Sequence, residues 1–188
     1  MRRVLRLTHV MRMDVSDESL ARAAADGDRQ AFALLVERVY DRVYGYAVKL
    51  SGSRTEAEDL AQDLCAALPT KLQSFRGEAK LTTWLYRITV NAARDRFRRA
   101  ATRARAADGW GDWELARQAE MAETAERVDW LMQAMSGLAV DLRETLALVL
   151  DGVTHKEAAQ ILEVSEGTVS WRVSEAKKKL KAMQEAEA

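Results

Sequence analysis

The chain has 188 residues, of which 48% are hydrophobic and 31% charged, and its formal net charge is zero. This composition excludes a disordered protein and allows one domain or two small ones. One cysteine excludes an internal disulfide framework, and two histidines leave no credible zinc site, so we expect neither a metal nor a cofactor. Strong helix formers dominate and proline occurs once, which predicts an all-α fold.

The N-terminal segment MRRVLRLTHVMRM is basic and has no apolar core of signal-peptide length. No stretch of the sequence is apolar enough to cross a bilayer. We therefore expect a cytoplasmic protein without membrane insertion, in which residues 1–15 form an N-terminal extension. Met11 and Met13 are candidates for an alternative translation start.

The first predicted helix begins at an N-cap, Ser16 or Asp17, because either side chain can accept hydrogen bonds from the first-turn amides. It ends near Gly27. The second helix carries an apolar stripe at helical spacing and stops at Gly52. The residues of that stripe are Phe32, Leu35, Val39, Val43, Tyr46 and Leu50.

The third predicted helix is capped by Ser53 or Thr55. Pro69 should bend or shorten it, since proline lacks an amide and clashes with the preceding turn. A loop at 74–80 leads to the fourth helix, within 81–99, where Trp84 faces inward. Residues 101–122 then read as a flexible linker, rich in small and charged residues. Trp110 and Trp113 within it either dock on a neighbouring helix or contact a partner.

Four more helices are predicted from residue 123 onward. The last two, capped by Thr154 and Ser165, form a helix-turn-helix unit from Thr154 to Lys181. Glu163 lies in its turn, where a left-handed backbone would cost roughly 1–2 kcal/mol. The exposed face of the second helix of this unit suits the DNA major groove. A solvated charged face remains the alternative reading.

Charge is strongly segregated along the neutral chain. Residues 71–105 hold ten basic side chains against Glu78 and Asp95, whereas residues 106–130 hold seven acidic side chains against two arginines. Because local fields steer association, a net charge of zero does not argue against a polyanionic partner.

Two segments resemble the extracytoplasmic-function (ECF) RNA polymerase sigma factors of the sigma-70 family. EAEDLAQDL followed by FRGEAKLTTWLYRITVNAARDRFRR resembles sigma region 2, and LRETLALVLDGVTHKEAAQILEVSEGTVSWRVSEAKKKLK resembles region 4. The resemblance implies two small helical domains, region 2 at 16–100 and region 4 at 123–183, with a tail at 184–188. It also implies a non-enzymatic factor that binds core RNA polymerase and directs promoter recognition and melting.

The resemblance also assigns roles to individual residues. Region 2 would bind the clamp helices of the largest polymerase subunit through the acidic segment Glu58, Asp59, Leu60, Gln62 and Asp63. It would capture an unpaired base of the −10 element and track the DNA backbone with Phe75, Arg76, Lys80, Arg87, Asn91, Arg94 and Arg98. Region 4 would read the −35 element with Glu166, Thr168, Ser170, Trp171, Arg172 and Lys177.

Other interpretations of the same sequence stay open. Members of this family are commonly held inactive by an anti-sigma factor, so we expect such a partner. A sigma-like mimic that sequesters an anti-sigma factor is one alternative. A helix-turn-helix regulator that binds duplex DNA without polymerase is another. An enzyme is disfavoured, because the sequence offers neither a metal cluster nor a histidine-based nucleophile pair.

Overall fold

The computed structural model describes residues 15–106 and 126–187, and within these ranges every regular element is a helix. The predicted all-α fold is therefore confirmed. The eight helices are α2 (Asp17–Ala25), α3 (Arg29–Ser51), α4 (Arg54–Leu72), α5 (Leu81–Ala106), α7 (Glu126–Ser136), α8 (Val140–Leu150), α9 (His155–Leu162) and α10 (Glu166–Glu187).

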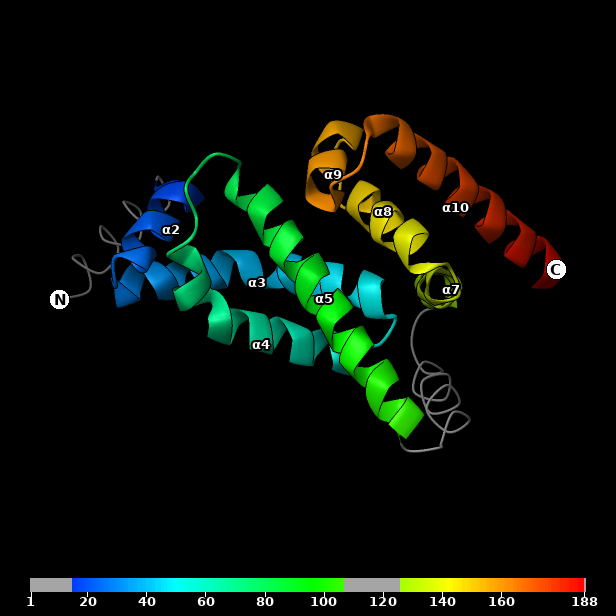
Figure 1. The fold of residues 1–188 in the computed structure, drawn as a ribbon, viewed down its shortest axis with the longest axis horizontal. Coiled ribbons are helices and arrows are strands. Elements are labelled where there is room, and N and C mark those ends of the chain that lie inside the picture. Colours follow the sequence, from blue (N-terminus) through cyan, green and yellow to red (C-terminus); the bar gives the residue numbers. More distant parts are fainter. Residues whose placement is uncertain (1–14, 107–125, 188) are drawn as a thin grey trace.

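Helices α2 to α5 form the first domain, and local side chains fix where they begin (Figure 1). The Ser16 hydroxyl accepts a hydrogen bond from the Ser19 amide at 3.2 Å, and Ser53 does the same for the Glu56 amide at 3.3 Å. The sequence left two candidate N-caps for each of these helices, and in both helices the structure has the serine. Gly52 stops α3 in a left-handed conformation with φ of 72°, as predicted.

Helix α3 is the centre of this domain and packs against α2, α4 and α5. Its predicted stripe faces inward, since Leu35, Val39 and Tyr46 are at most 1% exposed. Each apolar side chain buried in this way contributes roughly 1.5–3 kcal/mol to stability. Helix α4 continues for three residues beyond Pro69 and ends at Leu72, so the proline occupies its last turn.

The second domain comprises α7 to α10. Thr154 caps α9 with a reciprocal capping box, in which its hydroxyl accepts from the Glu157 amide and the Glu157 carboxylate accepts from the Thr154 amide. Ser165 accepts from the Thr168 amide at 3.1 Å at the start of α10, as predicted. Glu163 between the two helices has φ of 59°, and it is the one non-glycine residue of the described ranges with positive φ.

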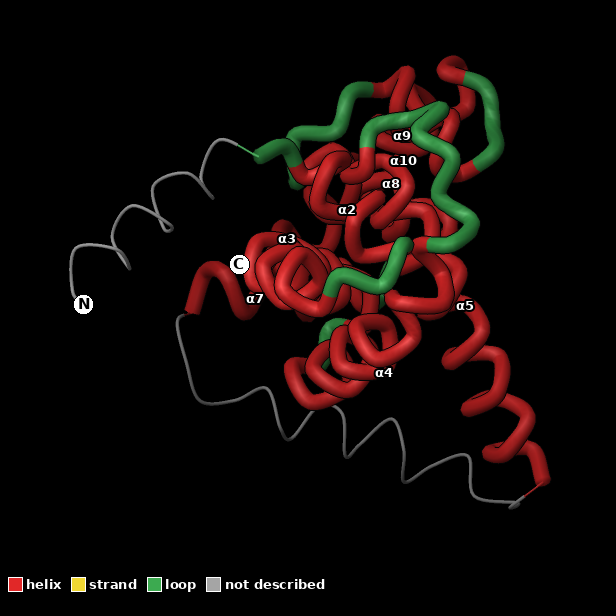
Figure 2. Tube along the Cα trace, turned by 90° about the vertical axis from the view of Figure 1, so that its left-hand side faces the viewer, coloured by secondary structure: helices red, strands yellow, loops and turns green. Residues whose placement is uncertain are grey.

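The two domains pack directly against each other. Helix α3 contacts α7 and α8, while α5 contacts α9, and one continuous apolar cluster joins Tyr46 and Val90 to Met135 and Leu146. At Gly52 the approach is close, since a Cβ atom there would lie 2.9 Å from the Cβ of Ser136. Figure 1 shows the second domain beside α3 and α5, and Figure 2 gives a view turned by 90°. Helix α10 packs on α7, α8 and α9 of its own domain.

Some predicted features fall at or beyond the described ranges. Helix α5 runs to Ala106, six residues into the predicted linker, and Trp110 and Trp113 lie outside the described residues. In the part of the chain that the structure covers, no helix combines the length and the hydropathy that a bilayer crossing requires.

Candidate nucleic-acid and polymerase interfaces

The acidic segment of α4 presents a charged outer face. Glu58, Asp59, Gln62 and Asp63 are all exposed there, as two adjacent pairs one turn of helix apart. Arg96 of α5 bridges two of them, with its guanidinium 2.7 Å from Asp59 Oδ2 and 3.2 Å from Asp63 Oδ2. The fifth predicted residue of this segment is placed differently. Leu60 is 3% exposed and packs in the core, where it holds α4 in place beneath the acidic face.

The loop between α4 and α5 is anchored by a contact with α2 where the loop meets α5. Glu18 of α2 accepts a hydrogen bond from the Leu81 amide at 3.3 Å and so caps the start of α5. The Phe75 ring lies 5.4 Å from the Trp84 ring, tilted by 56°, and both rings pack on the apolar core. Trp84 is partly buried against the core, on the inward side that its place in the stripe predicted. Phe75 remains half-buried and Arg76 beside it is exposed.

Three of the predicted −10 residues form one cationic stripe. Lys80, Arg87 and Arg94 are spaced by seven residues, and two helical turns bring such positions back to the same face. In the structure all three side chains reach into the second domain. We call this set the α5 stripe.

Each member of the α5 stripe has a specific partner. The Arg94 guanidinium donates two hydrogen bonds to Glu144, at 2.8 and 2.6 Å. Arg87 donates to the Gln160 carbonyl at 2.8 Å, and the Lys80 ammonium donates to Glu157 at 3.0 Å. The hydrogen bonds from Lys80 and Thr154 hold the pKa of the Glu157 carboxyl below its usual value.

The other two α5 residues predicted for the −10 element lie apart from these contacts. Asn91 is exposed on α5, and Arg98 is exposed and forms an ion pair with Asp95 one turn earlier. The structure therefore brings Lys80, Arg87 and Arg94 together and leaves Asn91 and Arg98 on open surface.

A second polar cluster lies at the interface between the two domains, which we call the seam. Lys49 of α3 pairs with Asp151 at the end of α8. Burial and the neighbouring Asp151 carboxylate raise the pKa of Tyr86 to about 12. Asp151 and Tyr86, with Lys80 and Glu157, also line a cavity of about 220 Å³ between the domains. The seam is thus polar at its edge and apolar in its middle.

The outer face of α10 is mostly open. Trp171 is 59% exposed, and Glu166, Ser170 and Lys177 are exposed around it. The Ser170 hydroxyl lies 3.0 Å from Nδ1 of His155, a contact that ties the start of α9 to α10. Four of the six predicted −35 residues therefore share one accessible surface.

The other two are Arg172 and Thr168. The Arg172 side chain is 17% exposed and its Nε lies 3.4 Å from Asp141 Oδ2 on α8. Thr168 is half-buried, with its hydroxyl 2.9 Å from the Ser165 hydroxyl at the helix cap. In this conformation both side chains hold the helix-turn-helix unit together.

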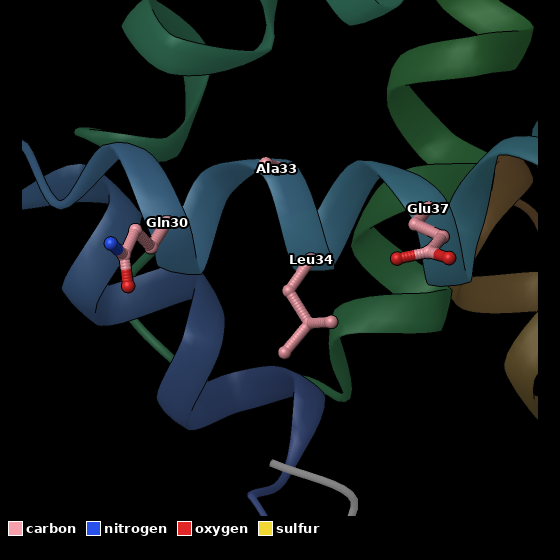
Figure 3. Close-up of a pocket in the computed structure, with 4 residues that line it drawn as sticks. All are labelled: Gln30, Ala33, Leu34 and Glu37. Atoms are coloured by element: carbon pink, nitrogen blue, oxygen red, sulfur yellow. The ribbon is translucent and has the colours of Figure 1, made fainter. Parts of the chain in front are cut away.

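A separate hollow lies on the first half of α3. Figure 3 shows its four lining residues, Gln30, Ala33, Leu34 and Glu37, all on this helix, around a volume of about 310 Å³. None of the predicted site residues lines it. Across residues 15–106 and 126–187, no group of histidine, cysteine, aspartate and glutamate side chains is arranged to hold a metal ion.

Sequence reasoning missed the acceptors on the second domain, Glu144, Asp151, Glu157 and the carbonyl of Gln160. The seven-residue spacing of the α5 stripe could have revealed a common face. Nothing in the local pattern around Glu144 marks it as a partner, because Arg94 lies 50 residues away in the sequence. His155 was also missed, although its place one residue after the Thr154 cap aims it at the next helix.

Comparison with known proteins identifies both domains. Residues 35–103 match the family model of sigma-70 region 2, and residues 128–180 match that of sigma-70 region 4. The chain is 33% identical over 170 residues to the ECF RNA polymerase sigma factor SigM of Mycobacterium tuberculosis, which covers 90% of this chain and 85% of that protein. It is 34% identical over 175 residues to the RNA polymerase sigma factor NccH of Alcaligenes xylosoxydans xylosoxydans, covering 89% and 94% of the two chains.

Solved structures agree with this assignment. CnrH in complex with the cytosolic domain of CnrY matches with a TM-score of 0.67 and 30% identity, covering 92% of this chain and 99% of that one. The fold is also that of the sigma factor RpoE of Bartonella quintana, solved with the anti-sigma factor NepR, with a TM-score of 0.68 and 24% identity over 84% and 98% of the chains. The predicted resemblance is confirmed: the chain belongs to the ECF RNA polymerase sigma factors of the sigma-70 family and acts in transcription initiation.

Proposed function

We propose that this sigma factor uses three separate surfaces, one to bind core polymerase and two to bind promoter DNA. The acidic face of α4, formed by Glu58, Asp59, Gln62 and Asp63, binds the clamp helices of core RNA polymerase. The 74–80 loop and the outer face of α5 capture the melted −10 element. The open face of α10 enters the major groove of the −35 element. The protein acts by binding, without catalysis, in the cytoplasm.

The polymerase surface rests on charge and exposure. Four polar residues stand outward on α4 while Leu60 anchors the helix in the core, so the acidic face is rigidly presented. Such a face is complementary to a basic helical partner and would speed its association. Arg96 orients Asp59 and Asp63 through its two ion pairs.

The −10 surface rests on the chemistry of strand opening. A flipped base needs a wall to stack on, and the displaced backbone needs cations along its path. Phe75 offers a half-buried ring at the start of the loop, and Arg76 beside it is exposed. Asn91 and Arg98 are exposed farther along α5. The α5 stripe would extend this track once its present partners are displaced.

The −35 surface rests on the exposure of α10, which is the single observation that carries the proposal. A capped helix with Ser170, Trp171 and Lys177 outward has polar and apolar groups for base edges near its start and cations for phosphates farther along. A core-directed Trp171 would have removed this surface.

The deciding experiment is in vitro transcription with purified core polymerase and a genomic DNA pool, followed by sequencing of the products. Discrete starts preceded by two shared motifs at constant spacing are expected. The absence of starts together with the absence of core binding would instead favour the mimic. Duplex binding that needs no polymerase would favour the stand-alone regulator. An anti-sigma partner is tested separately, by its ability to abolish these starts.

A further inference from the structure

The packing of α10 on its own domain directs the Trp171 ring outward. This ring is 59% exposed, which makes it the most exposed large apolar side chain among the described residues. The opposite side of the helix is buried, since Val169 is 0% exposed and Val173 is 7% exposed. Each valine lies two residues from Trp171, which corresponds to about 200° of rotation around the helix. The core contacts of the valines therefore hold the ring on the face proposed for the −35 element.

Small residues flank the ring along this face. Gly167 lies four residues before Trp171 and Ser174 three residues after it, so both share its side of the helix, and both are exposed. A Cβ atom at Gly167 would meet nothing closer than the hydroxyl oxygen of Ser165, at 3.7 Å. The backbone of α10 can thus approach the floor of a DNA groove closely, and the indole ring is the largest group that this face presents to the base edges.

The same part of α10 lacks the group that usually reads guanine. Between Glu166 and Glu175, a range that the structure describes throughout, the one basic residue is Arg172, which is 17% exposed and turned toward Asp141. Arginine or lysine bound to O6 and N7 is the commonest specific contact to guanine in the major groove. The lysines from Lys177 onward lie farther from the helix start, where they suit phosphates.

The remaining groups favour a different base. Thymine is the one base that presents an apolar group, its C5 methyl, on the major-groove edge. Contact between this methyl and an indole ring removes apolar surface of both partners from water. The Ser170 hydroxyl beside the ring is 3.0 Å from His155 Nδ1, and a serine hydroxyl pairs with donors and acceptors alike, so it discriminates weakly among bases. The ring is therefore the group on this face that can select a base strongly.

We infer that Trp171 determines the specificity of the −35 face by reading the C5 methyl group of thymine. The inference rests on the proposed role of α10 at the −35 element and adds the base feature that the helix reads. The −35 motif of this factor should accordingly carry a thymine, on one strand or the other, at the position that the ring contacts.

The test uses the holoenzyme, formed from the full chain and core polymerase, on a promoter identified by transcription of the genomic pool. Each thymine of the −35 motif, on either strand, is replaced singly by deoxyuridine, which pairs with adenine in the same way and lacks only the methyl group. Promoter binding is measured by competition of each modified template against the unmodified one. The variants are Trp171→Ala and Trp171→Phe. Leu150→Ala is the matched control, because it removes an apolar side chain, 46% exposed, from the end of α8.

The wild-type holoenzyme should bind about four-fold more weakly when the contacted thymine is replaced by deoxyuridine, as expected for the loss of one buried methyl group. Trp171→Ala should bind the two templates equally, because the ring that contacts the methyl is gone. Trp171→Phe keeps an aromatic ring and should keep part of the preference. Leu150→Ala should keep the full wild-type preference.

Three results would overturn the inference: equal binding of thymine and deoxyuridine at every −35 position, a preference for thymine that persists in Trp171→Ala, or a −35 motif without thymine. Weaker binding of Trp171→Ala to core polymerase, with promoter discrimination unchanged, would likewise show that the ring contacts the enzyme instead. A scrambled −35 motif separates these failures from that of the proposed function. If scrambling weakens binding and no single methyl matters, the inference alone fails. If scrambling changes nothing, or the pool yields no promoter, the proposed −35 surface fails and the inference fails with it.

Discussion

Arg94 of the first domain and Glu144 of the second are joined by two parallel hydrogen bonds, at 2.8 and 2.6 Å, across the seam. The pair ties a residue assigned to promoter DNA to a carboxylate that is 4% exposed. The hydrogen bond to Glu144 raises the pKa of Arg94, so the cation persists at every pH at which the protein is folded. The contact therefore joins the two domains through a residue whose proposed role is to bind promoter DNA.

The strength of this pair can be measured with a double-mutant cycle of Arg94→Ala and Glu144→Gln in urea unfolding. We expect a coupling energy of about 1–2 kcal/mol, because the exposed part of Arg94 screens a pair that would be stronger if fully buried. The Lys181–Glu185 pair, exposed on α10, is the control and should show coupling close to zero. Equal coupling energies in the two pairs would contradict a specific contribution of the Arg94–Glu144 pair to stability.

Gly52 should be essential for the approach of the two domains. Gly52→Ala places a Cβ atom 2.9 Å from the Ser136 Cβ and forces an L-residue to φ of 72°. The strain alone costs roughly 1–2 kcal/mol. Gly152→Ala is the matched control, with φ of 77° and nothing within 4 Å of the added atom. Thermal unfolding should show a larger loss for Gly52→Ala, and equal losses would mean that α7 moves aside freely.

Trp171 and Arg172 are neighbours with different expected phenotypes. Trp171→Ala should weaken −35-dependent transcription while changing the unfolding free energy by less than about 0.5 kcal/mol, because the ring is exposed. Arg172→Ala should weaken transcription and also lower stability, since it breaks the contact with Asp141. Promoter output that is unchanged in both variants would remove this part of α10 from the DNA surface.

Asp59→Lys should abolish tight binding to core polymerase, measured by co-elution with the purified enzyme, and leave the circular dichroism spectrum unchanged. The reversal repels a basic partner and also places a second cation beside Arg96. Glu37→Lys on α3 makes the same charge change at the separate hollow of Figure 3 and should bind normally. Retained binding by Asp59→Lys would refute the α4 assignment.

Because of Glu157, the stability of the folded protein should depend on pH in the acid range. Its hydrogen bonds to Lys80 and Thr154 lower the pKa of the carboxyl in the folded protein below its usual value of 4.5. The stabilisation is therefore fully present above pH 4.5 and is lost as the pH falls through the lowered folded value. The unfolding free energy followed from pH 7 downward should show this loss, and Glu157→Gln should remove that part of the profile.

The surroundings of Cys65 determine the reactivity of its thiol. It is half-buried on α4, and burial raises the pKa of its thiol, which keeps it protonated at neutral pH. The raised pKa makes this thiol a poor nucleophile at neutral pH.

The local features of the fold were determined by the sequence itself. The caps at Ser16, Ser53, Thr154 and Ser165 need only a side-chain oxygen and an amide three residues later, so a short stretch of sequence decides them. The inward stripe of α3 follows from helical periodicity in the same way. The resemblance to the two sigma regions likewise rests on contiguous motifs.

Other outcomes depended on which helices meet. Periodicity placed Arg172 on the outer face of α10, but α8 covers it. The resemblance placed Leu60 in the polymerase-binding segment, but its side chain lies in the core. The spacing of Lys80, Arg87 and Arg94 defined a common face without naming what lies on it. Only the tertiary structure decided that Glu144 would occupy it, because contacts between residues far apart in sequence depend on how whole helices pack and leave no local pattern.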